Sequence, residues 1–350
     1  MKRQAMCAML LAAFGALLTS SGCSQSKNAS TESAAASPAA KTRLAMVTDI
    51  GGLGDKSFND SAYAGLKEAA SRLGVEIQVL QSKSAADYQP NLSMLANGGA
   101  DEIVAIGFLL NKDLTSIASS YPNSHFAIVD AVVDQPNVAS VTFREQEGSF
   151  LAGALAALVS KTKTIAFLGG MDIPLLRKFE AGYTAGAHQI DPNVKVLVKY
   201  VGSFDDLPAG KELAGVLFND RADVVFAAAG KAGLGAIDEV RSRDRAYVIG
   251  VDANQDGLAP GKILTSMIKH VDVAVYRIAQ AAVERKWPAG SVELGLKDGA
   301  ISLTDMRYTK AAVGAANLAK IEALKKAIVS GKIVPPSTRE ELASFKPVVL

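Results

Sequence analysis

The stretch VTDIGGLGDKSFN, residues 47–59, carries the residue types of a small-molecule binding rim. An apolar run ends at Asp49, and the glycines after it let the backbone approach a ligand closely. Residues 56–59 then open a helix and place the ring of Phe58 and the amide of Asn59 near its N-terminus. A carboxylate, an amide and a ring at one turn can hydrogen-bond and stack a ligand, so we interpret this turn as a pocket rim.

The same turn lacks the pattern of a phosphate-binding loop. A Walker A motif has a glycine directly before its lysine, whereas Asp55 stands between Gly54 and Lys56 and would repel a phosphate. No GxGxxG pattern occurs at this turn either. We therefore expect neither nucleotide hydrolysis nor dinucleotide binding.

Polar residues or glycines also follow most of the other apolar runs of the chain. They are Gly107-Phe108, Asp130, Gly169-Gly170, Ala229-Gly230 and Asp252. Parallel sheets bind ligands beyond the carboxyl ends of their strands, so function is expected at these positions. Asp and Gly also start loops and cap helices for structural reasons alone, and each single position is open to that interpretation.

The elements expected to position these residues alternate between strand and helix. The expected strands are residues 44–47, 75–80, 103–106, 126–129, 165–168, 194–201, 224–227 and 248–251. The expected helices include residues 56–72, 87–97 and 145–160. Such alternation predicts parallel sheets with helices on both faces. The body from Thr42 onward exceeds the usual size of one core, so we predict an α/β protein with two doubly wound parallel-sheet lobes.

The N-terminus has the order of a secretory signal: basic residues, an apolar run over residues 5–18, and small residues before Cys23. This run is shorter than the roughly 20 residues of a spanning helix, so we expect residues 1–23 to be removed as a signal peptide. Cys23 resembles the lipidated cysteine of bacterial lipoproteins, although Ser20 stands where a large apolar residue is usual. A plain secreted protein is the alternative. The small polar residues 24–41 predict a flexible tether.

Composition argues against several other classes of protein. Cys7 and Cys23 both fall in the signal region, so the folded body has no disulfide and no cysteine zinc site. His125, His188 and His270 are far apart in sequence, and no metal site is expected. The formal charge is +2 and falls to near zero once the basic residues of the signal are removed, so no nucleic-acid partner is expected.

These features together resemble the basic membrane protein family of bacterial lipoproteins, whose members include purine nucleoside receptors of ABC importers. The first landmark is the Asp-x-Gly-Gly-x-x-Asp-x-Ser-Phe-Asn segment that starts at Asp49. The other matching landmarks are residues 127–130, Phe143, 148–153, 169–171, 179–186, 250–252 and 266–269. The resemblance covers nearly the whole body, from Leu44 to about Pro335.

The resemblance implies a type I periplasmic-binding-protein fold, in which a hinge of three crossings joins two lobes around a ligand cleft. It places residues 42–143 and 270–302 in lobe one, and residues 144–269 and 303–345 in lobe two. Hinge closure over the ligand, followed by docking on an ABC permease with its ATPase, is the implied mechanism. The implied location is the extracytoplasmic side of the cell membrane, reached through the lipid on Cys23.

The resemblance also assigns aromatic and base-binding residues. Phe58 and Phe179 occupy the positions between which a flat purine would lie, and such stacking is worth about 1–3 kcal/mol per base in nucleic-acid readers. Asp49, Asn59 and Asp130 correspond to the groups that hydrogen-bond the base.

The remaining implied contacts concern the sugar. Asp252 and Lys269 correspond to the groups that hold the ribose hydroxyls, and Gly230 lets the backbone come close. A carboxylate that accepts two hydroxyls would favour a nucleoside over a free base. The loop at residues 169–178 departs most from the family pattern, so the choice of base and sugar is less defined than the class of protein.

Three alternatives remain open from the sequence. Asp49, Asp130 and Asp252 could serve an enzyme, but the chain lacks the aspartates clustered on one loop that a metal-dependent nucleoside hydrolase needs, so no enzyme and no cofactor are expected. The same fold also serves receptors for sugars and signalling molecules. A surface adhesin without a transport role is the third alternative.

Overall fold

The computed structural model describes residues 41–349. The predicted signal peptide, the lipidation site Cys23 and the tether up to residue 40 lie outside the described residues. None of the helices in the described part is both long enough and apolar enough to cross a membrane.

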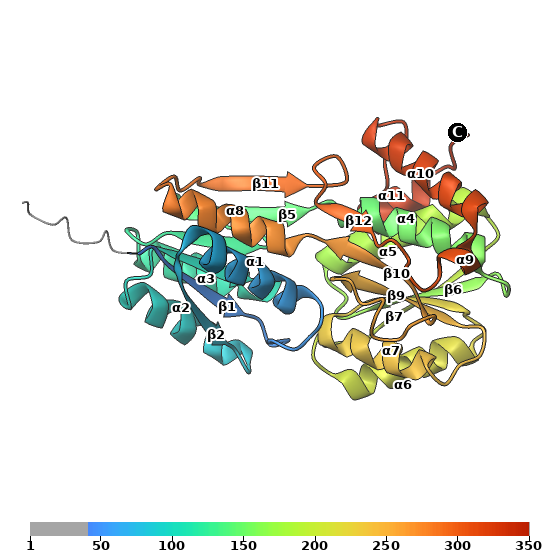
Figure 1. Cartoon of the computed structure of the whole chain (residues 1–350), viewed down its shortest axis with the longest axis horizontal. Coiled ribbons are helices and arrows are strands. Elements are labelled where there is room, and N and C mark those ends of the chain that lie inside the picture. Colours follow the sequence, from blue (N-terminus) through green and yellow to red (C-terminus); the bar gives the residue numbers. More distant parts are fainter. Residues whose placement is uncertain (1–40, 350) are drawn as a thin grey trace, which may run out of the picture. The chain divides into compact units, whose positions relative to one another are not determined.

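Lobe one is built on a parallel six-stranded sheet in the order β11-β5-β4-β3-β1-β2 (Figure 1). Its strands are β1 (Arg43–Thr48), β2 (Glu76–Gln81), β3 (Glu102–Ile106), β4 (Phe126–Val129), β5 (Val138–Phe143) and β11 (Gly290–Leu294). The strands from β1 to β4 lie where the apolar runs predict them. The sequence pattern missed β5, because its Ser and Thr residues weaken the apolar run, and β11, which is mostly exposed.

Lobe two is built on a second six-stranded sheet in the order β12-β10-β9-β8-β6-β7. Its strands are β6 (Thr164–Gly169), β7 (Lys195–Tyr200), β8 (Val224–Ala228), β9 (Tyr247–Asp252), β10 (Ile263–Lys269) and β12 (Ile301–Leu303). All pairs are parallel except β10 with β12. The predicted α/β class with two parallel sheets is confirmed.

Helices cover both faces of each sheet. On lobe one, α1 and α8 pack on one face, and α2 and α3 on the other. These helices are α1 (Phe58–Leu73), α2 (Tyr88–Asn97), α3 (Asn111–Ser120) and α8 (Val271–Val283). Because both faces are buried, the central strands β1 and β3 are apolar along almost their whole length.

Lobe two has the same arrangement. Helices α4 and α5 cover one face of its sheet, and α6 and α7 cover the other. They are α4 (Glu145–Val159), α5 (Pro174–Ile190), α6 (Leu207–Asn219) and α7 (Gly233–Val240). The C-terminal helices α10 and α11 pack on α4 and α5. The remaining helices are α9 (Lys310–Val313), α10 (Ala315–Val329) and α11 (Arg339–Ser344), with short 3₁₀ turns at Ala85–Asp87, Phe108–Leu110 and Gly230–Ala232.

The chain passes three times between the sheets: after β5, after β10 and after β11. Strand β12 begins at Ile301 and lies in the second sheet, close to the predicted boundary at residue 302. The residue limits of the two lobes stay a prediction.

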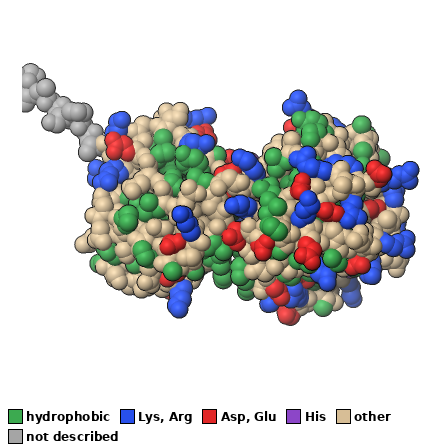
Figure 2. All heavy atoms as spheres, turned by 90° about the horizontal axis from the view of Figure 1, so that it is seen from below, with side chains coloured by type: hydrophobic (Ala, Val, Ile, Leu, Met, Phe, Trp, Pro, Cys, Tyr) green, Lys and Arg blue, Asp and Glu red, His purple; other side chains and the backbone are tan. Residues whose placement is uncertain are grey.

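Lys and Arg are interspersed with Asp and Glu over the face shown in Figure 2, and hydrophobic side chains gather in the band between the two halves.

Glycines let α4 and α5 pack backbone against backbone. A Cβ on Gly186 of α5 would lie 1.9 Å from the carbonyl oxygen of Phe150, and one on Gly153 of α4 would lie 1.9 Å from that of Tyr183. Real Cβ atoms do not approach this closely, so any side chain here would force the helices apart. This contact fixes the lobe-two end of the first crossing, since α4 follows it directly.

We predict that Gly186→Ala lowers the free energy of unfolding by about 1–3 kcal/mol, the usual cost of overpacking. Gly215→Ala is the matched control, because its Cβ would meet no atom closer than 3.5 Å and alanine is the better helix former. It should leave stability unchanged or raise it by up to about 1 kcal/mol. Urea unfolding of both variants measures this, and equal effects would contradict the close helix contact.

Candidate ligand-binding site

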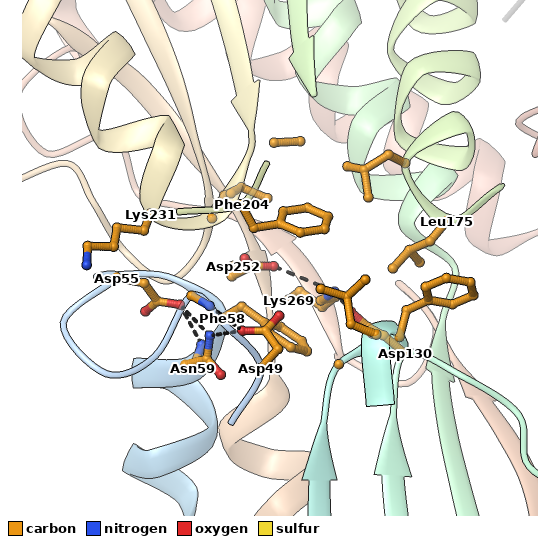
Figure 3. A pocket seen from close by; sticks show the side chains of 18 of the residues that line it. Asp49, Asp55, Phe58, Asn59, Asp130, Leu175, Phe204, Lys231, Asp252 and Lys269 are labelled. Atoms are coloured by element: carbon orange, nitrogen blue, oxygen red, sulfur yellow. Dashed lines mark hydrogen bonds and ion pairs between the residues drawn. The ribbon is translucent and has the colours of Figure 1, made fainter. Parts of the chain in front are cut away.

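A cavity with about 580 Å³ of empty space lies at the carboxyl ends of the strands of both sheets (Figure 3). All eight residues that the sequence singled out line this cavity: Asp49, Phe58, Asn59, Asp130, Phe179, Gly230, Asp252 and Lys269. Residues that are far apart in sequence thus meet beyond the carboxyl ends of the strands, where parallel sheets bind their ligands.

Asp49 and Asn59 form one wall on the lobe-one side. The Oδ1 atom of Asp49 accepts hydrogen bonds from the Gly51 backbone N–H and from Asn59 Nδ2, both at 2.9 Å. Burial raises the pKa of Asp49 to about 6, although these two donors oppose the shift. Both hydrogens of the Asn59 amide have acceptors within the protein, but its buried Oδ1 has no partner among the described residues.

Asp55 organises this wall, and the sequence analysis missed it. Its carboxylate accepts backbone hydrogen bonds from Ser57, Asn59 and Asp60 at 2.8–3.0 Å and so caps the start of α1. Its Oδ2 also accepts from the side chain of Asn59 at 3.1 Å. The signal was present in the sequence as an acidic residue just before a helix, but we used it only to exclude a phosphate loop.

Lys269, at the end of β10, is the buried centre of the site. Its Nζ atom lies 2.6 Å from Asp130 Oδ2, 3.7 Å from Asp252 Oδ1 and 3.9 Å from Glu145 Oε1. Burial by itself lowers the pKa of this ammonium, but the three carboxylates outweigh burial and raise the pKa above that of a free lysine. Lys269 therefore stays charged and joins residues of both lobes.

Three aromatic rings surround the same ammonium. The Nζ atom of Lys269 lies 4.8 Å from the ring centroid of Phe58, 5.5 Å from that of Phe143 and 5.6 Å from that of Phe179. A cation within about 6 Å of a ring is attracted by the electrons of its face. Phe179 is also packed against the core ring of Phe226 and is only 3% exposed.

Asp130 and Asp252 both occupy the left-handed region of backbone conformation, with φ of 69° and 64°. Each lies where a strand of its sheet ends, so the turn directs both carboxylates toward Lys269. Burial raises the pKa of Asp252 to about 6, while Lys269 and Ser57 oppose the shift. Ser57 Oγ of lobe one donates to Asp252 Oδ2 of lobe two at 2.6 Å, and this bond links the two lobes.

Phe204 is the second residue that the sequence analysis missed. It follows β7, and it enters the cavity from the lobe-two side, opposite Phe58 (Figure 3). Gly170 makes room for this ring, because a Cβ there would lie 2.3 Å from Phe204 Cδ1. Gly230, with φ of 56°, packs on the same residue. The strand-end rule applied to β7 would have found Phe204.

Glu145, the first residue of α4, is fully buried beside the cavity and was also missed. Lys178 Nζ lies 2.9 Å from Glu145 Oε2, so two lysines share this carboxylate. Among the described residues, no group of three or more His, Cys, Asp or Glu side chains is placed to hold a metal ion.

Two lobes, three crossings and a polar cavity between the strand ends define a solute-binding protein of the periplasmic type. A crystal structure of an ABC transporter solute-binding protein from Aeropyrum pernix K1 is similar to this chain, with a TM-score of 0.79 and 30% identity over 86% of this chain and 95% of that one. The family profile for PnrA-like ABC transporter substrate-binding proteins, Bmp, matches residues 42–338. The chain belongs to this family, and the resemblance found in its sequence is confirmed.

Two relatives show how far the similarity extends. The ABC transporter nucleoside-binding protein BmpA of Lactococcus lactis is 37% identical over 84% of this chain and 89% of its own length. An uncharacterized lipoprotein of Pyrococcus abyssi is 37% identical over 78% of this chain and 71% of its own length. The chain is thus an ABC transporter substrate-binding protein.

We predict that Lys269→Met lowers the free energy of unfolding by about 3–5 kcal/mol, because it leaves the buried carboxylates of Asp130 and Asp252 without their cation and Glu145 with Lys178 alone. The folded variant should then hold protons at a pH where the unfolded chain has lost them. Its stability deficit should therefore shrink as the pH falls from 8 to 5.

Urea unfolding over this pH range measures the deficit. Lys56→Met is the matched control, because the Lys56 side chain is 59% exposed and pairs only with Asp60 at the surface. It should leave stability nearly unchanged. A Lys269 deficit that is small or independent of pH would show that the buried ion pairs do not hold the lobes.

Proposed function

We propose that this protein captures a purine nucleoside in the interlobe cavity and delivers it to an ABC importer. The observation that carries the proposal is the pair of rings, Phe58 and Phe204, facing a cavity whose polar groups include carboxylates, an amide and two ammonium groups. Such a site suits a flat base joined to a ring that carries several hydroxyls. The name of the Lactococcus lactis relative, a nucleoside-binding protein, supports this choice.

The base lies between the two rings. Phe58 is partly buried at the start of α1 and packs against the hydrophobic core, and a Cβ on Gly107 would lie 3.4 Å from its ring, so glycine there leaves room beside it. Phe204 approaches from the other lobe and completes the stack when the lobes close. Phe179 was the partner expected from the sequence, but its contacts with Phe226 and Lys269 favour a supporting role behind the stack.

The edge of the base is read by Asp49, Asn59 and Asp130. Asn59 Oδ1 and Asp130 Oδ1 are buried acceptors without a partner among the described residues. A buried acceptor left unpaired costs about 1–3 kcal/mol, so a ligand N–H that reaches it gains affinity. Asp49, with only Oδ1 engaged by protein donors, offers its second oxygen in the same direction.

The ribose lies against Asp252 and Lys269, with Gly230 allowing the backbone to approach. Asp252 Oδ2 already accepts from Ser57 Oγ, and its Oδ1 lies 3.7 Å from the ammonium. Two ribose hydroxyls can donate to this carboxylate while Lys269 balances its charge. A sugar receptor would need the same groups, but it would not need two opposed rings.

The lipid anchor on Cys23 and the transport partners complete the proposal. The name of the Pyrococcus abyssi relative, a lipoprotein, supports a protein held at the outer face of the cell membrane. The permease and ATPase of an ABC importer would then receive the closed, loaded protein.

Calorimetric titration with nucleosides, free bases and sugars tests the cargo directly. Tight binding of a sugar alone, or cleavage of inosine to its base, would refute the proposal.

We predict that Phe58→Ala and Phe204→Ala each weaken nucleoside binding by about 1–3 kcal/mol, since each removes one side of the stack. Phe179→Leu is the matched control, because leucine keeps the core filled but cannot stack. It should change affinity by a smaller amount. Isothermal titration with inosine and adenosine measures all three variants. An effect of Phe179→Leu equal to that of Phe204→Ala would restore Phe179 as the stacking partner.

We predict that Asp252→Asn weakens the binding of nucleosides more than the binding of free bases. The amide keeps the size of the side chain but loses the charge that accepts ribose hydroxyls, and it should cost about 1.5–3 kcal/mol for a nucleoside. Titration of the variant with inosine and with hypoxanthine gives the two losses. Equal losses would mean that Asp252 does not contact the sugar.

A further inference from the structure

A second cavity, with about 630 Å³ of empty space, lies in lobe one. It borders the amino ends of β3, β4 and β5, whereas the interlobe cavity lies at the carboxyl ends of the strands. Its other walls are the last turns of α8 and the segment that follows that helix, residues 286–289. Nothing in the proposed transport cycle uses this cavity.

One buried carboxyl, that of Glu102, lines the second cavity. Glu102 begins β3 and is 4% exposed, and its side chain makes no hydrogen bond or ion pair within the described part of the chain. Lys286 also lines the cavity, but its Nζ lies 3.0 Å from Glu284. Burial raises the pKa of Glu102 to about 8. Burying an ionised carboxylate without a hydrogen-bond donor or cation beside it costs free energy, and a bound cation would offset that cost.

The other walls are aromatic and apolar. The rings of His125 and Trp287 stack with centroids 4.0 Å apart and planes only 7° from parallel. His125 directly precedes β4, and because Ile103 pairs with Phe126, it is the neighbour of Glu102 across the sheet. Ile278 of α8 and three prolines complete the lining. A carboxylate beside aromatic and apolar surface is the chemistry that binds organic cations in proteins.

We propose that this second cavity binds a small organic ammonium ion, with its charge against Glu102 and its alkyl groups against the His125–Trp287 pair. An anion would face the carboxylate without a free cation to balance it. A metal ion would need more ligands than the cavity offers, since its only metal-binding side chains are Glu102 and His125. The proposal does not depend on the cargo of the interlobe cavity.

Trp287 is the only tryptophan of the chain, so fluorescence excited at the long-wavelength edge of tryptophan absorption, where the eight tyrosines do not absorb, reports on this cavity. The probes are choline and its uncharged analogue of the same shape, 3,3-dimethylbutan-1-ol, at a pH above about 8, where Glu102 is ionised. Choline should change the fluorescence in a saturable way and bind far more tightly than the alcohol. Glu102→Gln should weaken choline about thirtyfold or more, as expected when one partner of a buried charge pair is lost, and leave the alcohol unchanged.

Glu76→Gln is the matched control, because Glu76 begins β2, the edge strand of the same sheet, but is exposed. It should bind choline like the unaltered protein. Glu102→Asp, which keeps the charge, should retain more affinity than Glu102→Gln, and circular dichroism checks that each variant folds. Nucleoside affinity in Glu102→Gln should not change, which separates this site from the proposed transport function.

Two results would overturn the proposal. One is the absence of a saturable change in Trp287 fluorescence with choline, tetramethylammonium and butylammonium; the cavity would then bind no organic cation beside Glu102. The other is equal binding of choline to the unaltered protein and to Glu102→Gln, which would place the ammonium elsewhere.

Discussion

The ammonium of Lys269 is the interaction on which the architecture of the site depends. It is 2% exposed, and a lone charge at that depth would be strongly unfavourable. The carboxylates that balance it come from different parts of the chain: Asp130 from the first sheet, Asp252 from the second, and Glu145 from the helix after the first crossing. The two lobes and the hinge must therefore be correctly placed together for any of these groups to be satisfied.

Such a cluster contributes more to specificity of structure than to net stability. Replacing a buried ion pair by apolar residues is often neutral, whereas removing one partner alone is costly. Apolar residues would hold the lobes equally well, but they could not form hydrogen bonds to a polar ligand. Under the proposed function, Asp130 and Asp252 would accept hydrogen bonds from the ligand while Lys269 balances their charge. The cluster thus combines a link between the lobes with a binding surface.

The sequence predicted the parts of the site that depend on one local rule. Asp49, Asp130, Asp252 and Gly230 all follow from the strand ends of parallel sheets, and they line one cavity as expected. The sequence did not predict that Asp130 and Glu145 also reach Lys269, since which carboxylates surround an ammonium depends on how the crossings bring the lobes together. Phe179 and Phe204 show the same limit. Both are aromatic residues of lobe two that line the cavity, and only the packing around each ring, that of Phe179 against Phe226 and that of Phe204 over Gly170, distinguishes them.

The charges around the interlobe cavity also restrict the class of ligand. Its lining includes the carboxylates of Asp49, Asp55, Asp130 and Asp252, but only two ammonium groups, those of Lys231 and Lys269. Lys269 is already engaged with carboxylates, and Asp55 caps α1 at the position where a phosphate-binding loop would present free backbone N–H groups. A phosphate would therefore meet carboxylates instead of donors. The site should thus accept a nucleoside and reject the corresponding nucleotide, which follows from the same residues that line its walls.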